Sequence, residues 1–304
     1  MSIIEKVLDK LDDDQVAEKS PKKKEARENE QARVASDSAE VHKSAETETE
    51  VDTNVVHHRE VELDFEKLSR LGILTPHTVN IKLTEQLRRI KSTILTNAFG
   101  KYSLGIENQN MVMVTSAIQN EGKSFTSLNL VMSIAKEFNH TVLYIDADVT
   151  KRNMEKLFSF KNQKGLVDYL LGDDKDLAEF LVKTNVPRLT LLPSGRPFDK
   201  VTELWSSERM NELMSELSQR YSNRLIVFDA PPLLQDSSAS ILARMVGQTL
   251  IIVEAEKTPK HLVDEAVAIL DEQQYIGLIL NKSNQRDTSE YGYYAYGEDP
   301  NDDK

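Results

Sequence analysis

The pattern of apolar and polar positions divides the chain into a polar first part and a globular part that begins near residue 61. In the globular part, short apolar runs are bounded by polar residues, at 111–114, 142–145, 189–192, 225–228, 250–253 and 276–280. Runs without alternation are typical of strands buried on both faces, as in a parallel sheet. Helical patterns lie between most of them, so the succession predicts an α/β fold with a mostly parallel, doubly wound sheet flanked by helices.

The chain before residue 61 has a different character. Segment 13–60 is dominated by Glu, Lys, Asp, Ala, Ser and Thr and contains no aromatic residue. It cannot bury enough surface to offset its chain entropy, which predicts a disordered linker. Segment 1–12 is predicted to be a short amphipathic helix, which alone is too short to be stable in water and is either a fraying end or a docking element. Its apolar residues recur at helical spacing, at Ile4, Val7, Leu8 and Leu11.

Composition narrows the possible functions. The chain of 304 residues has a formal net charge of -12, and an acidic chain is a poor generic binder of nucleic acid or anionic lipid. It has no cysteine, which excludes thiolate metal sites, iron–sulfur clusters and cysteine nucleophiles. No apolar run approaches the roughly 18 residues that span a bilayer, and the first residues do not resemble a signal peptide. We therefore expect a cytoplasmic protein that reaches the inner face of the membrane only through a partner.

A phosphate-binding loop is indicated after the first apolar run. The run is followed by TSAIQNEGKS (115–124) and then by a helical pattern. Gly122, Lys123 and Ser124 thus stand at a strand-to-helix junction, where backbone N–H groups and the helix dipole attract an anion. Lys123 would reach the β- and γ-phosphates, and the Ser124 hydroxyl would ligate Mg²⁺. The first glycine of the usual motif is Ala117 here, so an ordinary helix start with an incidental GKS is the alternative.

Three aspartates weaken that alternative. Asp146 and Asp148 follow one apolar run, and Asp229 follows another. The carboxyl ends of parallel strands border the crevice where α/β proteins bind ligands. Each aspartate alone is equally well explained as a helix cap. Together with the GKS loop they predict a magnesium and nucleotide site, because Mg²⁺ takes oxygen ligands.

These segments resemble the bacterial tyrosine kinases of capsule and exopolysaccharide synthesis. The matching motifs are a Walker A loop, SAIQNEGKS (116–124), a Walker A′ motif, VLYIDAD (142–148), and a Walker B motif, LIVFDAPP (225–232). The resemblance extends over residues 62–282, and the opening MSIIEKVLDKLD together with LDFEKLSRLGIL (63–74) is similar to the exosortase-associated branch of that family. It implies a P-loop NTPase fold, ATP as the phosphoryl donor and Mg²⁺ as the cofactor.

The resemblance also implies roles for particular residues. It assigns catalysis to Lys123, Asp146 and Asp148. One aspartate would position or deprotonate the tyrosine hydroxyl and the other would hold Mg²⁺ through water, and the choice between them stays open. The metal set is Ser124, Asp148 and Asp229. The nucleotide-binding set is Asn120, Glu121, Gly122, Lys123, Ser124, Phe125 and Asn281.

Two departures from the family pattern stand close to this site. Gln119 and Asn120 replace the family's Pro-Gly. Asparagine tolerates left-handed backbone angles better than most residues, so we expect the loop to survive with reduced fit. Arg152 falls near the family's basic pair after the Walker A′ motif, but the following proline is Asn153.

The C-terminal segment 291–304 is predicted to be a phosphoacceptor tail that follows a kinase domain over 61–290. Four of the chain's nine tyrosines fall within six positions there, and no helix or strand period fits their spacing. The alternative is a tail that docks on its own domain or on a partner. The resemblance favours autophosphorylation. The four tyrosines are Tyr291, Tyr293, Tyr294 and Tyr296.

A helix over 82–98 carries a candidate assembly motif. Glu85, Arg88 and Lys91 stand three apart on its polar side. They match the family's Glu-x-x-Arg-x-x-Arg assembly motif, with lysine in the last place. The alternative is a solvated helix face with internal ion pairs. Its apolar face is formed by Leu83, Leu87, Ile90 and Ile94.

Our hypothesis is a ring-like homo-oligomer that phosphorylates its tails in trans. Each added phosphate carries about -1.5 to -2 charges, which would drive an already acidic assembly apart. The resemblance further implies a separate membrane-bound activator of the polysaccharide co-polymerase, or chain-length, class. Nucleic acid is not an expected partner.

Two other functions compete with a kinase. One is a positioning or partitioning ATPase similar to the septum-site and plasmid-partition proteins, whose signature lysine stands where this chain has Ile118. The other is an inactive nucleotide-binding scaffold, which the Gln119-Asn120 departure keeps open. Nitrogenase-like reductases share the fold but need cysteine, so they are excluded.

Overall fold

The computed structural model describes residues 59–78, 80–100, 105–160, 164–172, 176–220, 223–271 and 274–283. The predicted helix over 1–12, nearly all of the predicted linker and the four tail tyrosines lie outside the described residues. The first strand, β1 (Arg59–Val61), takes two residues from the end of the predicted linker.

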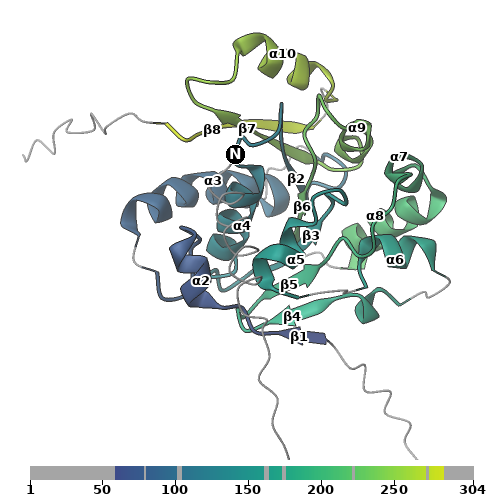
Figure 1. Ribbon diagram of the computed structural model, residues 1–304, viewed down its shortest axis with the longest axis horizontal. Helices are drawn as coiled ribbons and strands as arrows, with labels where there is room; N and C mark the ends of the chain where they lie inside the picture. Colours follow the sequence, from purple (N-terminus) through teal and green to yellow (C-terminus); the bar gives the residue numbers. More distant parts are fainter. Residues whose placement is uncertain are drawn as a thin grey trace, which may run out of the picture.

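The described residues form one eight-stranded sheet in the order β1-β4-β5-β3-β6-β2-β7-β8 (Figure 1). From β5 to β8 the strands are parallel, while β4 is antiparallel to β5 and β1 runs parallel to β4. The prediction of a mostly parallel sheet is confirmed. The remaining bounds are β2 (Met111–Ser116), β3 (Thr141–Asp146), β4 (Val182–Thr184), β5 (Leu189–Leu192), β6 (Arg224–Asp229), β7 (Gln248–Glu254) and β8 (Tyr275–Asn281).

Helices cover both faces of this sheet (Figure 1). Side chains alternate between two cores, so Met111 and Met113 of β2 enter one and Val112 and Val114 enter the other. This explains why the central strands read as continuous apolar runs. One core packs under α2 (Phe65–Arg70), α3 (Ile81–Phe99), α4 (Lys123–Ile134) and α5 (Asn153–Phe158). The other packs under α6 (Leu166–Leu171), α7 (Val201–Trp205), α8 (Glu208–Arg220), α9 (Ser237–Ala243) and α10 (Lys260–Ala268), with a short 3₁₀ turn at Leu177–Glu179.

The prediction that every apolar run is buried on both faces is wrong for β8. Its residues alternate in exposure, and Leu278 and Leu280 are 58% and 66% exposed. The physical reason is position, because β8 is the last strand of the sheet order and has a neighbour only on the β7 side. An edge strand has fewer elements available to cover its faces.

The predicted helix over 82–98 is confirmed as α3. Asn80 caps its start, where the side chain accepts a hydrogen bond from the Leu83 amide. Leu87 and Ile94 are buried, while Leu83 and Ile90 pack against the same core. In the part of the chain that the structure describes, no helix combines the length and the apolar character needed to cross a bilayer.

Candidate active site

The loop between β2 and α4 lies at the carboxyl end of the central strands. Gly122 ends the loop with a φ of 96°, and Asn120 is also left-handed with a φ of 69°. A Cβ at Gly122 would come within 2.1 Å of the Asn281 side-chain nitrogen. Only glycine therefore allows the loop to lie this close to the end of β8. The first amides of α4 are therefore available to an anion at the end of the sheet.

A buried carboxylate holds the loop in shape from inside. Glu121 is fully buried, and its Oε2 accepts a hydrogen bond from the Ile118 amide at 2.8 Å. Its Oε1 accepts from the Glu254 amide at 3.2 Å and from the Thr258 hydroxyl. Asn281 donates to the Glu121 carbonyl at 2.9 Å. Glu121 and Asn281 thus organise the loop, and the Glu121 carboxylate is already occupied by protein donors.

The two residues that depart from the family's Pro-Gly are anchored by other parts of the chain. The Gln119 amide donates to the Gln235 side chain at 3.0 Å. The Asn120 carbonyl accepts from Lys282 Nζ at 2.6 Å, and the same ammonium contacts Glu254 Oε2 at 3.0 Å. The left-handed angle expected of Asn120 is confirmed, and contacts from β7 and β8 support it.

Lys123 and Asp148 form a buried ion pair. Lys123 Nζ lies 2.8 Å from Asp148 Oδ2, and the two side chains are 5% and 3% exposed. Asp146 faces Asp229 in the register of β3 and β6. Its two carboxylate oxygens accept backbone N–H groups from Asp148 at 3.2 Å and from Met154 at 3.1 Å. All three predicted aspartates and the lysine therefore meet at the ends of two adjacent strands.

The electrostatics of this cluster reflect burial and an excess of carboxylates. Burial raises the pKa of Asp146 well above its usual range, and the charge of Asp229 adds to the effect. Burial also raises the pKa of Asp229, although the charge of Lys123 opposes it. For Lys123 burial lowers the pKa, but the charges of Asp229 and Asp148 outweigh it, so the pKa lies above its ordinary value. One lysine faces three carboxylates, an imbalance that a divalent cation would relieve.

The donor set fits magnesium. Asp229 Oδ1 is buried and has no hydrogen-bond partner among the described residues, so one carboxylate oxygen is unsatisfied. The Ser124 hydroxyl accepts from the Asn153 side-chain Nδ2 at 3.0 Å and still has its own proton to donate or release. Within the described residues, no three His, Cys, Asp or Glu residues are arranged to hold a metal ion by themselves. Magnesium commonly binds one or two carboxylates together with phosphate oxygens and waters.

Other predicted residues lie away from the cluster. The Phe125 ring packs beside Gly72 and joins the core under α3, so its side chain is part of the core. Arg88 and Glu85 form an exposed ion pair at 3.2 Å on α3. Lys91 instead contacts Glu137 and is only 15% exposed. The three residues of the predicted assembly motif therefore do not form one free surface.

Sequence reasoning missed several residues of the site. Glu254 stands directly after an apolar run, as Asp229 does, so the rule that found Asp229 would also have found it. Gln235 and Lys282 gave no signal, because each contacts a backbone group of the loop. Asn153 stands out in the sequence only as a missing proline, because its contact with Ser124 depends on the turn that follows Asp148.

Comparisons with known proteins agree with this geometry. A family model described as "AAA domain" matches residues 113–272. The chain is 32% identical over 234 residues to the tyrosine-protein kinase CpsD of Streptococcus agalactiae, covering 76% of this chain and 97% of that protein. It is 30% identical to the tyrosine-protein kinase YwqD of Bacillus subtilis, covering 74% of this chain and 90% of that protein. It is 33% identical to the tyrosine-protein kinase wzc of Salmonella typhi, but the match covers only 26% of that protein.

Solved structures of the same kind share the fold. The VpsO kinase domain matches with a TM-score of 0.56 and 28% identity, covering 67% of this chain and 97% of that chain. The kinase domain of the Escherichia coli tyrosine kinase ETK matches with a TM-score of 0.60 and 24% identity, covering 79% and 93%. The match to ETK, at 24% identity, shows a shared fold and no more. With near-complete coverage of CpsD and YwqD, this chain belongs to the family of bacterial tyrosine-protein kinases.

Proposed function

We propose that this protein is an ATP- and Mg²⁺-dependent tyrosine autokinase that phosphorylates the C-terminal tyrosines of a second copy and thereby regulates exopolysaccharide synthesis or export. The observation that carries the proposal is the buried pair of Lys123 and Asp148 beside Asp229, at the start of α4, in a chain of the tyrosine-protein kinase family. The chemistry of phosphoryl transfer is mainly positioning and charge stabilisation, and this cluster supplies both.

Nucleotide binding follows from the loop and its lysine. The amides at the start of α4 and Lys123 would bind the β- and γ-phosphates of ATP, and Lys123 would exchange its contact with Asp148 for one with phosphate. Ser124, Asp148 and Asp229 would hold Mg²⁺, which supplies charge neutralisation to the phosphates. Asn281 would line one side of the nucleotide site, because it ends β8 and its side chain already contacts the loop.

The transfer itself exchanges one bond for another. The bond between the γ-phosphorus and the bridging oxygen of ATP breaks, a bond from the γ-phosphorus to the phenolic oxygen of tyrosine forms, and ADP leaves. The phenolic proton must go to a base. With Asp148 and Asp229 in the metal set, we assign the proton acceptor to Asp146, whose orientation is fixed by backbone N–H groups of Asp148 and Met154.

The proposal includes a homo-oligomer and a separate membrane-bound activator of the polysaccharide co-polymerase class. The activator's cytoplasmic segment should raise the rate of tyrosine phosphorylation when it is added to the purified kinase. An unchanged rate at saturating concentrations would argue against this partner.

Phosphotyrosine mapping tests the proposed function. The full-length protein is incubated with Mg-ATP and examined by mass spectrometry, with Lys123→Met as the comparison. Phosphate on residues 291–296 that is lost in Lys123→Met is the expected result. Steady ATP turnover without phosphotyrosine would identify a positioning ATPase, and nucleotide binding with neither activity would identify a scaffold. Full activity of Lys123→Met would overturn the active-site assignment.

A further inference from the structure

A small charged cleft lies beside the candidate active site and takes no part in the chemistry proposed above. It has a volume of about 170 Å³, below the roughly 300–1,000 Å³ of pockets that enclose a nucleotide-sized ligand. A space of this size suits one or two side-chain groups. Its lining residues are Arg152, Glu155, Lys164, Asp168, Gly195, Arg196 and Pro197.

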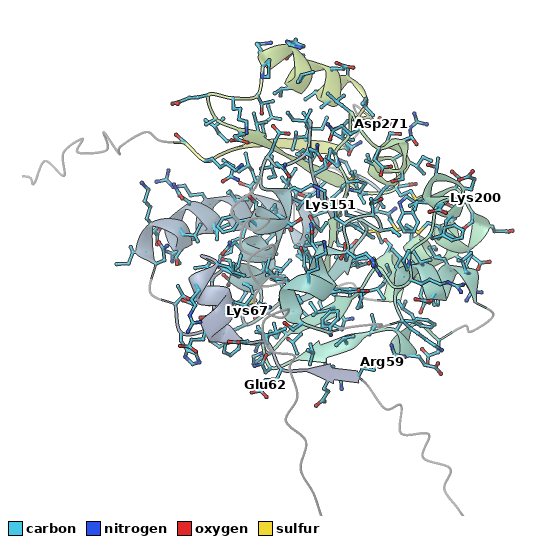
Figure 2. All side chains as sticks on the ribbon, in the orientation of Figure 1. Arg59, Glu62, Lys67, Lys151, Lys200 and Asp271 are labelled. Carbon is cyan, nitrogen blue, oxygen red and sulfur yellow. The ribbon has the colours of Figure 1, made fainter. Side chains whose placement is uncertain are left out.

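One wall of the cleft is continuous with the active site. The Arg152 amide donates to the Asp148 carbonyl at 2.9 Å, and the next residue, Asn153, donates to the Ser124 hydroxyl at 3.0 Å. Lys151, labelled in Figure 2, marks this turn between β3 and α5. A group bound in the cleft would therefore lie one short turn away from Lys123 and Asp148.

The other wall is built from the start of α6 and the loop after β5. Asp168 Oδ2 accepts backbone N–H groups from Gly165 at 3.0 Å and from Arg196 at 3.2 Å. Gly195 has a φ of 86°, and a Cβ there would come within 2.3 Å of the same oxygen. Backbone contacts thus fix the two segments of this wall relative to each other.

The cleft has more positive than negative groups. Arg152, Lys164 and Arg196 face the two carboxylates Glu155 and Asp168. The ion pairs are long, at 3.7 Å for Arg152 with Glu155 and 3.4 Å for Arg196 with Asp168. Arg196 is 57% exposed and uses only Nε in its pair, which leaves further donors for a ligand. No ion pair among the described residues involves Lys164, so an acidic ligand would meet an uncompensated cation there.

We propose that this cleft binds the acidic side chains that flank the tail tyrosines of a second copy, and so selects that tail as the substrate. The inference rests on the proposed autokinase function and names its substrate class as acidic, tyrosine-containing peptide. Residues 290–303 contain five acidic and no basic side chains. The cleft and this segment are complementary in charge, and an arginine fork binds carboxylates through paired hydrogen bonds.

A phosphorylation assay between two full-length copies tests the proposal. The enzyme copy has its four tail tyrosines changed to phenylalanine, and the substrate copy is Lys123→Met with an intact tail. A second substrate copy also has the acidic side chains of segment 290–303 changed to Asn or Gln. Each substrate is titrated against the enzyme with and without Lys164→Gln and Arg196→Gln, and phosphotyrosine on the substrate is measured.

The expected result is coupling between the cleft and the acidic side chains. The native substrate should show a KM about five- to tenfold higher with the Lys164→Gln/Arg196→Gln enzyme, as expected for two partly exposed charge pairs. The neutral tail should show a similar rise with the unaltered enzyme, and the cleft substitutions should then add little. A charge-reversed pair tests the same contact: the Lys164→Glu/Arg196→Glu enzyme is combined with a substrate whose acidic tail residues are changed to lysine. This combination should recover part of the lost affinity, seen as a lower KM.

The matched control removes a cation elsewhere. Lys260→Gln changes an exposed residue of α10, which Figure 1 shows well away from α5 and α6, and KM should stay within about twofold. Equal KM values for the acidic and neutral tails with the unaltered enzyme would overturn the cleft assignment. No phosphotyrosine on any substrate copy would instead count against the autokinase function itself.

Discussion

The Lys282 ammonium at the end of β8 donates to the Asn120 carbonyl across 2.6 Å, and so ties the last described strand to the phosphate loop. The contact falls on Asn120, where the family pattern that this sequence resembles has glycine, and it anchors the loop from another part of the chain. We predict that Lys282→Met raises the Kd for Mg-ATP about tenfold, because a hydrogen bond from a charged donor contributes roughly 1.5–3 kcal/mol. Isothermal titration calorimetry would measure the change.

Lys257 offers a matched control for this prediction. It pairs with the same Glu254 at 3.2 Å but is 65% exposed, and its ammonium contacts Glu254 rather than the loop. Lys257→Met should leave the Kd within about twofold, since exposed pairs contribute little. Equal losses in the two variants would show that the charge near Glu254 matters, and that the link to Asn120 does not.

A second prediction concerns the close approach at Gly122. Gly122→Ala forces a left-handed alanine and displaces the Asn281 side chain from its bond to Glu121, so the free energy of unfolding should fall by about 2–3 kcal/mol. Gly105→Ala carries the same kind of backbone strain, with a φ of 70° and nothing near its Cβ, and should cost about 1 kcal/mol. Urea denaturation would compare them. Similar losses would contradict a steric role for Asn281.

A third prediction separates stability from metal binding at Asp229. Asp229→Asn removes a buried charge whose Oδ1 has no partner among the described residues. We expect the free energy of unfolding of the nucleotide-free protein to stay within about 1 kcal/mol of the original value or to rise, because Lys123 offsets only part of the cost of burying this carboxylate and keeps Asp148 as its partner in the variant. The rise in Tm on adding Mg-ATP should be lost. A variant that retains the full Mg²⁺-dependent rise would remove Asp229 from the metal set.

The pH dependence of the same variant gives a fourth prediction. The folded-state pKa of Asp229 lies above its unfolded value, so its contribution to stability is fully present below about pH 4 and is lost as the pH rises through the folded pKa. The difference between the free energy of unfolding of Asp229→Asn and that of the parent protein should therefore shift in favour of the variant as the pH rises above about 4. Denaturation without Mg²⁺ across a pH series would reveal the trend. A difference that stays constant or shrinks would contradict the raised pKa.

The fifth prediction assigns different roles to two residues of the candidate assembly motif, one in self-association and one in stability. Arg88 is exposed, so Arg88→Glu should weaken self-association at least several-fold while Tm changes by less than about 2 °C. Lys91 contacts Glu137 within its own chain, so Lys91→Met should lower Tm by about 2–5 °C. Sedimentation velocity and thermal unfolding would give the two readouts. Unchanged self-association in Arg88→Glu would remove that residue from the proposed interface.

The sequence was most informative where local pattern and burial coincide. All of the apolar runs became strands, and the apolar positions of β2, β3 and β6 are buried throughout. The strands β1 and β4 were missed, since each has three residues and too few apolar positions to form a pattern. The exosortase-associated branch stays a prediction, as it depends in part on segment 1–12.

The residues of the candidate site also fall into two groups, those that local sequence pattern predicts and those that it does not. Lys123 could be predicted because motif spacing places it at the start of a helix, and Asp146, Asp148 and Asp229 could be predicted because they end or follow apolar strands. The support from Lys282 and Gln235 could not, because a side chain that binds a distant carbonyl or amide leaves no pattern in the sequence. The largely buried position of Lys91 depends on where the end of α4 meets α3, which helical periodicity alone does not give.

The ion pair of Lys123 with Asp148 also bears on product release. A buried lysine that lost its phosphate partner with no replacement would leave an uncompensated charge, at a cost of about 3–5 kcal/mol. Asp148 lies 2.8 Å away and can accept the lysine as ADP departs. Under the proposed function, departure of ADP would exchange one counter-ion for another, which would lower the barrier to nucleotide exchange. The same carboxylate that would hold the metal during transfer would thus let the spent nucleotide leave and the next turnover begin.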